Sequence, residues 1–166
     1  MLLLARAGVQ ASVPTEPILV KLLLEEATGT HRQQFPLRAV AVSVKPAGLM
    51  LHGQPQYMKQ VVQNLMSNAE KYSPGEGQID LRARQKRDDV VISIHDRGSG
   101  IAPQEAEIIF QAFFRSDKTS TKATGAGIGL AVCKLLVQAQ SGRIWAKPRR
   151  GGGSVFSFSL PAVLVA

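Results

Sequence analysis

The stretch Pro55–Tyr72 constrains the fold more than any other part of the chain, because it predicts one long amphipathic helix. Pro55 suits the first turn of a helix, and Ser73-Pro74-Gly75 would end it. The apolar face of this helix is formed by Val61, Val62, Leu65, Met66, Ala69 and Tyr72. A helix with one such face buries it against another layer of structure.

The rest of the chain mixes helix and strand patterns. We expect helices over residues 15–27, 103–110 and 126–140, and a mobile loop over residues 111–124. Strands are expected over residues 35–44, 48–52, 78–85, 90–95, 143–147 and 154–160, with the third and fourth forming a β-hairpin. This order predicts an α+β fold, a two-layer α/β sandwich with a mixed, mostly antiparallel sheet covered on one face by about three helices.

A polar stripe runs along the same long helix. Gln60, Asn64, Asn68 and Lys71 have the spacing i, i+4, i+8 and i+11, which places them on one face. Asparagine amide oxygens are hard ligands for Mg²⁺, and a lysine can contact a phosphate. The alternative is a solvated polar face that happens to hold asparagines.

A second feature is Asp96-Arg97-Gly98-Ser99-Gly100-Ile101, directly after a predicted strand. An acidic residue at the end of a buried strand, followed by glycines, places a carboxylate at the rim of a pocket. Such a carboxylate can accept a hydrogen bond from an exocyclic amine such as that of adenine. The alternative is a capping aspartate in an ordinary turn.

A third feature is Gly125-Ala126-Gly127-Ile128-Gly129-Leu130, at the entrance to a predicted helix. Glycines at a helix N-terminus expose backbone N–H groups, and the helix dipole favours an anion such as a triphosphate there. The spacing G-x-G-x-G, late in the chain and after a polar loop, does not fit the dinucleotide-binding fingerprint. No Gly-Lys-Ser/Thr follows, so the stretch is not a P-loop either.

In this order and with these separations, the three features resemble the ATP-binding catalytic domain of sensor histidine kinases, in the wider group that includes gyrase and the Hsp90 chaperones. Residues 64–72 are similar to its N box, residues 96–101 to its G1 box, residues 110–115 to its F box and residues 125–130 to its G2 box. Residues 152–161 are similar to its final strand. The resemblance covers roughly residues 14–161, and it implies the fold predicted above.

The resemblance also implies roles at the metal and phosphate end of a nucleotide site. Asn68 would be the chief Mg²⁺ ligand with Asn64 beside it, and Lys71 would reach the phosphates of ATP. Arg115 would be a further phosphate contact. The G2 box would let a lid close over the phosphates, through Gly125, Gly127, Ile128, Gly129 and Leu130.

At the adenine end, the resemblance implies that Asp96 recognises the adenine amine. Gly98, Gly100 and Ile101 would shape that wall, and Tyr72 would pack near the nucleotide. Three aromatic residues, Phe110, Phe113 and Phe114, are expected to pack the lid, whereas Met66 and Cys133 belong to the core.

The sequence departs from the family pattern at three places. Gln54 stands where an acidic residue is frequent, and Gln140-Ser141 replaces a common His-Gly pair. Gyrase-like members have a general-base glutamate one turn before the Mg²⁺-binding asparagine, where this chain has Asn64. Because Glu70 lies on the other side of Asn68, phosphotransfer is favoured over ATP hydrolysis.

The phosphoacceptor is expected outside this chain. We expect His31 in a loop, His52 at the end of a strand and His95 next to Asp96, each with a structural or surface role. Residues 1–13 are expected to be the tail of a helical dimerisation and phosphoacceptor hairpin, and residues 14–166 to be the ATP-binding domain. Such a fragment binds ATP and Mg²⁺ as a monomer but does not autophosphorylate, and its partners are that hairpin and a cognate response regulator. The expected location is the cytoplasm, in a parent that is either free or membrane-anchored.

Two other interpretations of the sequence remain open beside this resemblance. The single cysteine excludes an internal disulfide, and the formal net charge of +8 suggests a polyanionic partner. One alternative is an anti-sigma-factor-type serine kinase, which shares the nucleotide boxes. The other is a basic module that binds nucleic acid, which would leave the three motifs unexplained. We therefore expect no nucleic acid, and we interpret the alternating cations of residues 82–87 as a solvated strand face.

Overall fold

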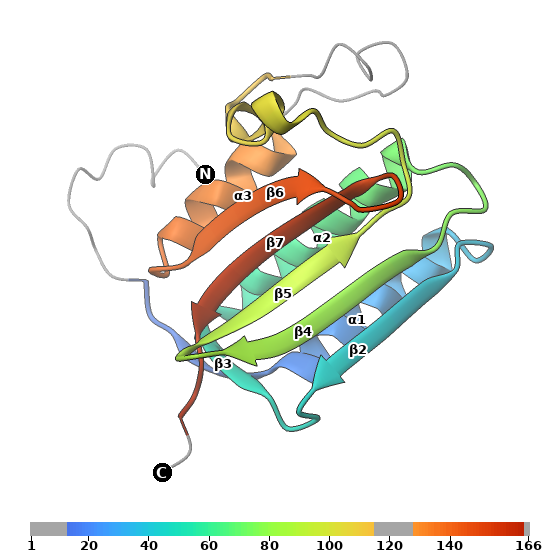
Figure 1. Ribbon diagram of the computed structural model, residues 1–166. Coiled ribbons are helices and arrows are strands. Elements are labelled where there is room, and N and C mark those ends of the chain that lie inside the picture. The colour runs from blue at the N-terminus through green and yellow to red at the C-terminus, as the bar shows by residue number, and fades with distance from the viewer. Residues whose placement is uncertain (1–12, 115–127, 165–166) are drawn as a thin grey trace.

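The computed structural model describes residues 13–114 and 128–164, and in these two ranges it forms two layers (Figure 1). One layer is a five-stranded sheet in the order β2-β4-β5-β7-β6. Its strands are β2 (Val40–Lys45), β4 (Ile79–Lys86), β5 (Asp89–His95), β6 (Arg143–Pro148) and β7 (Ser154–Pro161). The helices α1 (Val20–Gln34), α2 (Pro55–Tyr72) and α3 (Gly129–Gln138) cover one face of it.

The sheet is mixed but mostly antiparallel. Only β2 and β4 pair in parallel, whereas β4–β5, β5–β7 and β6–β7 pair antiparallel. A separate two-stranded sheet joins β1 (Glu16–Leu19) to β3 (Met50–Gly53). The predicted fold class, the bounds of the long helix and the β4–β5 hairpin are therefore confirmed.

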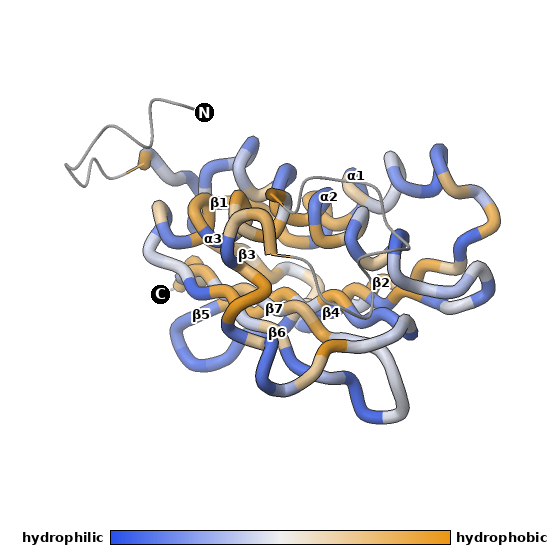
Figure 2. Tube along the Cα trace, turned by 90° about the horizontal axis from the view of Figure 1, so that it is seen from above, coloured by the Kyte–Doolittle hydropathy of each residue, from blue (hydrophilic) through white to orange (hydrophobic). Residues whose placement is uncertain are grey.

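The core lies between the two layers. Apolar residues of the helices and the strands face one another there, as Figure 2 shows from above. The apolar stripe of α2 is fully enclosed at Val61, Leu65 and Met66, and opposite it Ile92 and Phe158 of the sheet are inaccessible to solvent. This burial positions α2 and its polar stripe on the sheet.

The beginning of the first predicted helix was wrong. Ile18 and Leu19 belong to β1, where they pair with Leu51 and Met50 of β3, and helix α1 begins only at Val20. The helix then continues to Gln34, so His31 is buried in a helix and not exposed in a loop. The strand pairing that ends the extended segment comes from residues more than thirty positions away, so local periodicity could not reveal it.

Two other predicted segments are shorter or of another type. Residues 35–39 form no strand but a turn, in which the N–H of Arg38 donates to the carbonyl oxygen of Phe35 over 3.1 Å. Instead of one helix over residues 103–110 there are two 3-10 turns, η1 (Pro103–Glu105) and η2 (Ile108–Phe110). Helix α3 is described from Gly129 onwards and ends before the predicted boundary, at Gln138.

Two of the departures from the family pattern meet in space. The side chain of Gln54 caps α2 by accepting a hydrogen bond from the N–H of Tyr57 over 2.7 Å. The backbone N–H of Gln54 donates in turn to Oε1 of Gln140 over 2.6 Å, and Nε2 of Gln140 donates to the carbonyl oxygen of Leu136 over 2.7 Å. The two glutamines thus tie the beginning of α2 to the end of α3.

Within the described ranges, no helix has the length and apolar character needed to cross a bilayer.

Candidate nucleotide-binding site

A pocket opens where the C-terminal half of α2 meets the segment that follows β5. Its empty volume is about 500 Å³, including space open to solvent. The predicted site residues that line it are Asn68, Tyr72, Asp96, Gly100, Ile101 and Leu130. Phe114, which was predicted to pack the lid, also lines it. The remaining lining residues were not predicted as site residues; they are Ser99, Ile109, Ser154 and Phe156. The structure therefore brings residues of three predicted motifs to one cavity.

Asp96 is the charged residue at the inner end of this pocket. Only 3% of it is exposed, and its Oδ1 accepts hydrogen bonds from the backbone N–H of Gly98 over 2.9 Å and of Ser154 over 3.1 Å. Within residues 13–114 and 128–164, no partner is recorded for the second carboxylate oxygen. Asp96 is thus held in place by one oxygen while the other is available to a ligand.

Burial raises the pKa of Asp96 above its usual range, although the two backbone N–H donors and the charge of Arg149 act in the opposite direction. In the pocket without a ligand, the hydrogen-bond donors around the ionised Asp96 carboxylate therefore do not fully offset the cost of its burial. A ligand that donates a hydrogen bond to the second oxygen would supply one, and an exocyclic amine is such a donor.

Two glycines allow backbone segments to meet behind Asp96. A Cβ on Gly98 would lie 2.2 Å from the carbonyl oxygen of Tyr72, and a Cβ on Gly153 would lie 2.1 Å from the carbonyl oxygen of Asp96. Neither distance is compatible with a side chain, so the end of α2, the segment after β5 and the β6–β7 turn are in direct backbone contact. The motif predicted Gly98 as part of the pocket wall, but Gly98 is not among the residues that line the pocket. The close backbone approaches at Gly98 and Gly153 were not predicted.

The polar stripe of α2 is only partly directed into the pocket. Asn68 lines it, but Asn64 does not, and Lys71 is exposed at the surface. Asn64 lies instead near Cys133 of α3. Burial raises the pKa of the Cys133 thiol to about 12, and a hydrogen bond with Asn64 opposes that rise.

The donor set is compatible with a magnesium ion bound together with a triphosphate. Among the described residues, no group of three or more His, Cys, Asp or Glu side chains could hold a metal ion. A magnesium ion beside Asn68 would therefore take one amide oxygen from the chain and the rest of its ligands from phosphate oxygens and water.

Part of the phosphate end lies outside the described residues. Arg115, Gly125 and Gly127 belong to the stretch 115–127, of which nothing is described. Ile128 is 40% exposed and precedes α3, Gly129 is its first residue, and of these two neither lines the pocket. Of the described residues of this predicted box, 128–130, only Leu130 lines the pocket.

The three phenylalanines predicted to pack the lid differ from one another. Phe110 is buried against Phe156 of β7, with ring centroids 6.4 Å apart, and Phe114 lines the pocket. Phe113 is 71% exposed. Two of them thus contribute to the described pocket region.

The sequence analysis missed a buried cluster around Arg38, just outside the pocket. Nε and Nη2 of Arg38 donate to the two carboxylate oxygens of Glu70 over 2.9 and 2.8 Å. Nη1 donates to the carbonyl oxygens of Pro74 and Gly77 over 2.5 and 2.6 Å, and Nη2 also reaches that of Ser73 over 3.4 Å. The cluster fastens the loop after α2, which directly follows the pocket residue Tyr72, to the turn between α1 and β2.

Glu70 also contacts His31, whose Nε2 lies 2.9 Å from Oε2 of the glutamate. Burial would raise the pKa of Glu70, but the hydrogen bonds and charges of Arg38 and His31 outweigh it and hold that pKa below its usual range. Glu70 is thus bound to Arg38 and His31, and it is not among the residues that line the pocket.

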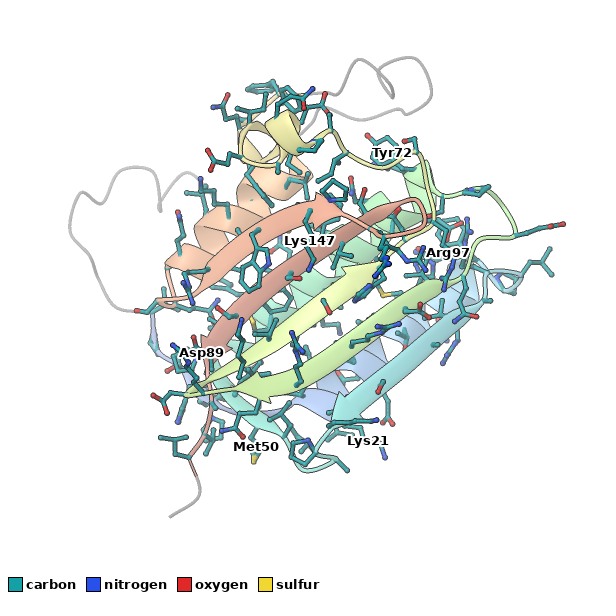
Figure 3. The ribbon with its side chains drawn as sticks, viewed as in Figure 1. Lys21, Met50, Tyr72, Asp89, Arg97 and Lys147 are labelled. Carbon is teal, nitrogen blue, oxygen red and sulfur yellow. The ribbon has the colours of Figure 1, made fainter. Side chains whose placement is uncertain are left out.

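A second cluster surrounds Arg97, directly after Asp96. Its Nη2 donates to Oδ2 of Asp80 over 3.0 Å, and its Nη1 donates to the carbonyl oxygen of Gln78. Burial would raise the pKa of Asp80, but hydrogen bonds from Gln78 and Arg97 and the nearby arginine charges hold it below its usual range. Figure 3 shows Arg97 and Tyr72 at the same end of the sheet, near the pocket.

Comparison with known proteins agrees with this geometry. A family model described as histidine kinase-, DNA gyrase B-, and HSP90-like ATPase matches residues 53–164. The sensor-like histidine kinase SenX3 of Mycobacterium tuberculosis is 35% identical over 151 residues, which cover 89% of this chain and 36% of SenX3. The chain therefore spans little more than a third of the length of that relative.

Two solved structures are similar along most of the chain. The mycobacterial sensor histidine kinase MprB has a TM-score of 0.80 and 26% identity, covering 91% of this chain and 99% of that one. The structure of full-length ShkA in complex with AMPPNP has a TM-score of 0.83 and 26% identity, covering 98% of this chain and 34% of that one. The chain belongs to the family of histidine kinase-, DNA gyrase B-, and HSP90-like ATPases.

Proposed function

We propose that this chain is the ATP-binding catalytic domain of a two-component sensor histidine kinase, and that it donates the γ-phosphate of ATP to a histidine outside the chain. The observation that carries the proposal is Asp96, a buried carboxyl with one oxygen held by two backbone N–H groups and the other available in the pocket. That arrangement suits an adenine amine better than a phosphate, which a buried carboxylate would repel.

The adenine would lie against Asp96, with Ile101 and Tyr72 on the apolar walls beside it. Gly100 lines this end of the cavity, and Gly98 would support it from behind through its close approach to the backbone of Tyr72. The triphosphate would then extend along α2 towards Asn68 and the entrance of α3 at Gly129.

A magnesium ion bound with the nucleotide would neutralise phosphate charge during transfer. Asn68 is its proposed protein ligand, supported by Asn64 from the preceding turn. Lys71 would swing from its exposed position to the phosphates, with Arg115 as a second contact. Residues Gly125 and Gly127 to Leu130 would cover the triphosphate, so that water is excluded while the acceptor histidine attacks.

Transfer to a histidine is favoured over hydrolysis because no carboxylate occupies the general-base position on α2. Asn64 stands at that position, and Glu70 is bound to Arg38 and His31. Residues 1–13 would lead from a helical phosphoacceptor hairpin, and residues 14–166 would act on it from the cytoplasmic side. A response regulator would then receive the phosphate.

Calorimetric titration with ATP and with AMPPNP, each with and without Mg²⁺, tests the proposal. Asp96→Asn should weaken adenine nucleotide binding by at least about tenfold, the usual size of a lost hydrogen bond to a charged group. Its fold should survive, because the asparagine oxygen can still accept from Gly98 and Ser154. Asp88→Asn, an exposed acid in the β4–β5 turn, is the matched control and should bind as the wild type does.

Asn68→Ala should remove the Mg²⁺-dependent part of the affinity, whereas Ser67→Ala, its exposed neighbour, should not. Unchanged nucleotide affinity in both Asp96→Asn and Asn68→Ala would refute the assigned site.

A further inference from the structure

The three described α-helices cover one face of the five-stranded sheet, and its other face is turned away from them (Figure 1). This second face carries a groove with basic walls. The empty volume of the groove is about 1170 Å³, including space open to solvent. Five cationic side chains line it, and none of its lining residues is acidic; the cations are Lys45, Arg82, Arg84, Lys86 and Lys147.

The strand register explains the concave shape. Arg84 of β4 lies between Lys45 of β2 and Val91 of β5, and Lys147 of β6 lies beside Val155 of β7. Between these strands, β5 and β7 present shorter side chains, among them the paired Ser93 and Ser157, together with His95. Long basic side chains therefore form the two walls, and small residues form the floor. Figure 3 shows Lys147 on this face.

The cations of the groove are poorly neutralised. Arg84, Lys45 and Lys147 have no acidic partner among the described residues. Oδ2 of Asp80 already accepts a hydrogen bond from Arg97. Nη2 of the exposed Arg82 side chain lies 3.8 Å from the same oxygen.

The pKa of His95, which lines the same groove, is lowered by burial and by nearby cations. Burial lowers the pKa of His95, the charges of Arg82, Arg149 and Lys147 lower it further, and only Asp80 opposes them. The basic groove is thus an electropositive surface, which an anionic partner would complement.

We propose that this groove binds an extended acidic polypeptide segment. Residues two apart on a strand are separated by about 6.6–6.8 Å, so Arg82, Arg84 and Lys86 match carboxylates on alternate residues of an extended peptide. Arginine fits a carboxylate through two parallel hydrogen bonds.

Two other polyanions fit less well. A single-stranded nucleic acid needs several aromatic residues on which successive bases stack, and Trp145 is the one aromatic residue other than His95 among the lining residues. An anionic membrane is flat, and a recessed floor between two basic walls would not touch it.

Trp145 makes the test direct, because it is the only tryptophan of the chain and lies in the groove. The whole chain is titrated with a synthetic (Glu-Val)4 peptide while tryptophan fluorescence is followed at low and at physiological salt. We expect a saturable change that weakens as salt is raised, and none with a (Lys-Val)4 peptide.

Charge reversal supplies the matched comparison. Arg84→Glu with Lys147→Glu should weaken binding of the acidic peptide by at least about tenfold, since both lie in the groove without an internal partner. Lys21→Glu with Lys134→Glu, an equal charge change on the helix layer, should alter it less than about twofold. ATP binding by the groove variant should equal that of the wild type, which confirms its fold and keeps the two proposals separable.

The proposal is overturned if the peptide causes no saturable change, or if the groove variant binds it as tightly as the helix-layer variant does. It is also overturned if a twelve-residue oligothymidylate or vesicles rich in phosphatidylglycerol affect Trp145 at lower concentration than the peptide does.

Discussion

Two arginines next to the nucleotide pocket make the same kind of contact in different surroundings. Arg38 and Arg97 each bind a carboxylate and at least one backbone carbonyl group, and each fastens a segment that carries pocket residues. The Arg38 side chain is 4% exposed, whereas that of Arg97 is 33% exposed. Ion pairs that water reaches contribute little to stability, while breaking a buried pair is costly, so the two clusters should differ in energy more than in geometry.

The largest effect is expected from Arg38→Met. It leaves the largely buried Glu70 carboxylate with His31 as its remaining side-chain partner and three carbonyl groups without the Arg38 donor. This should lower the free energy of unfolding by about 3–5 kcal/mol. Urea denaturation measures the loss. Arg32→Ala is the matched control, because Arg32 makes one exposed hydrogen bond to the carbonyl of Val40 and should cost less than about 1 kcal/mol. Equal losses in the two variants would contradict the importance of burial.

A double variant tests whether Arg38 and Glu70 stabilise the fold as a pair. Arg38→Met combined with Glu70→Leu removes both charges, so no unpaired charge remains buried. The double variant should therefore be more stable than the sum of the single losses predicts, by about 1–3 kcal/mol. Strict additivity in a double-mutant cycle would show that Arg38 and Glu70 do not act as a pair.

Arg97→Ala should have a smaller effect on unfolding, about 1 kcal/mol, because Asp80 keeps its hydrogen bond from Gln78 and the nearby charge of Arg82. Its effect on the pocket should be clearer, since Arg97 directly follows Asp96 and fixes the direction of the chain there. We expect weaker ATP binding in calorimetry with nearly unchanged stability. A stability loss as large as that of Arg38→Met would remove the distinction between the clusters.

The smallest effect is expected from pH. The pKa values of Glu70 and Asp80 lie below their usual range in the folded chain, so the stability they contribute is present above the unfolded pKa and is lost as pH falls. Unfolding free energy should therefore decrease between about pH 5 and pH 3. The raised pKa of Asp96 acts the other way, because its protonation favours the folded state as pH falls.

Asp96→Asn should consequently make the acid loss steeper, and Glu70→Gln should make it shallower. Urea denaturation across this pH range, with both variants beside the wild type, checks the two signs independently. The same slope in all three proteins would contradict the assigned pKa directions.

Sequence reasoning succeeded where the signal was local. The periodicity of α2 and the placement of Asp96 after a strand, followed by Gly98, needed only neighbouring residues. It failed for the Arg38 cluster, because Glu70 lies 32 residues away and residues 35–39 were assigned to a strand. The extent of β1 was missed for the same reason, since only pairing with β3 defines it. Helical spacing placed Asn64 on one stripe with Asn68, but only Asn68 lines the pocket, and Asn64 lies near Cys133 of α3.

The reactivity of the buried Cys133 thiol, which lies between α2 and α3, can be used to detect when these two helices separate. Cys133 is inaccessible to solvent, and burial raises its pKa to about 12, so a thiol reagent cannot react with it while the helices stay together. It is the single cysteine of the sequence, so any alkylation of the chain marks one event, the separation of α3 from α2. Alkylation rates measured with and without nucleotide would then give the free energy of that opening, one helical turn from Asn68.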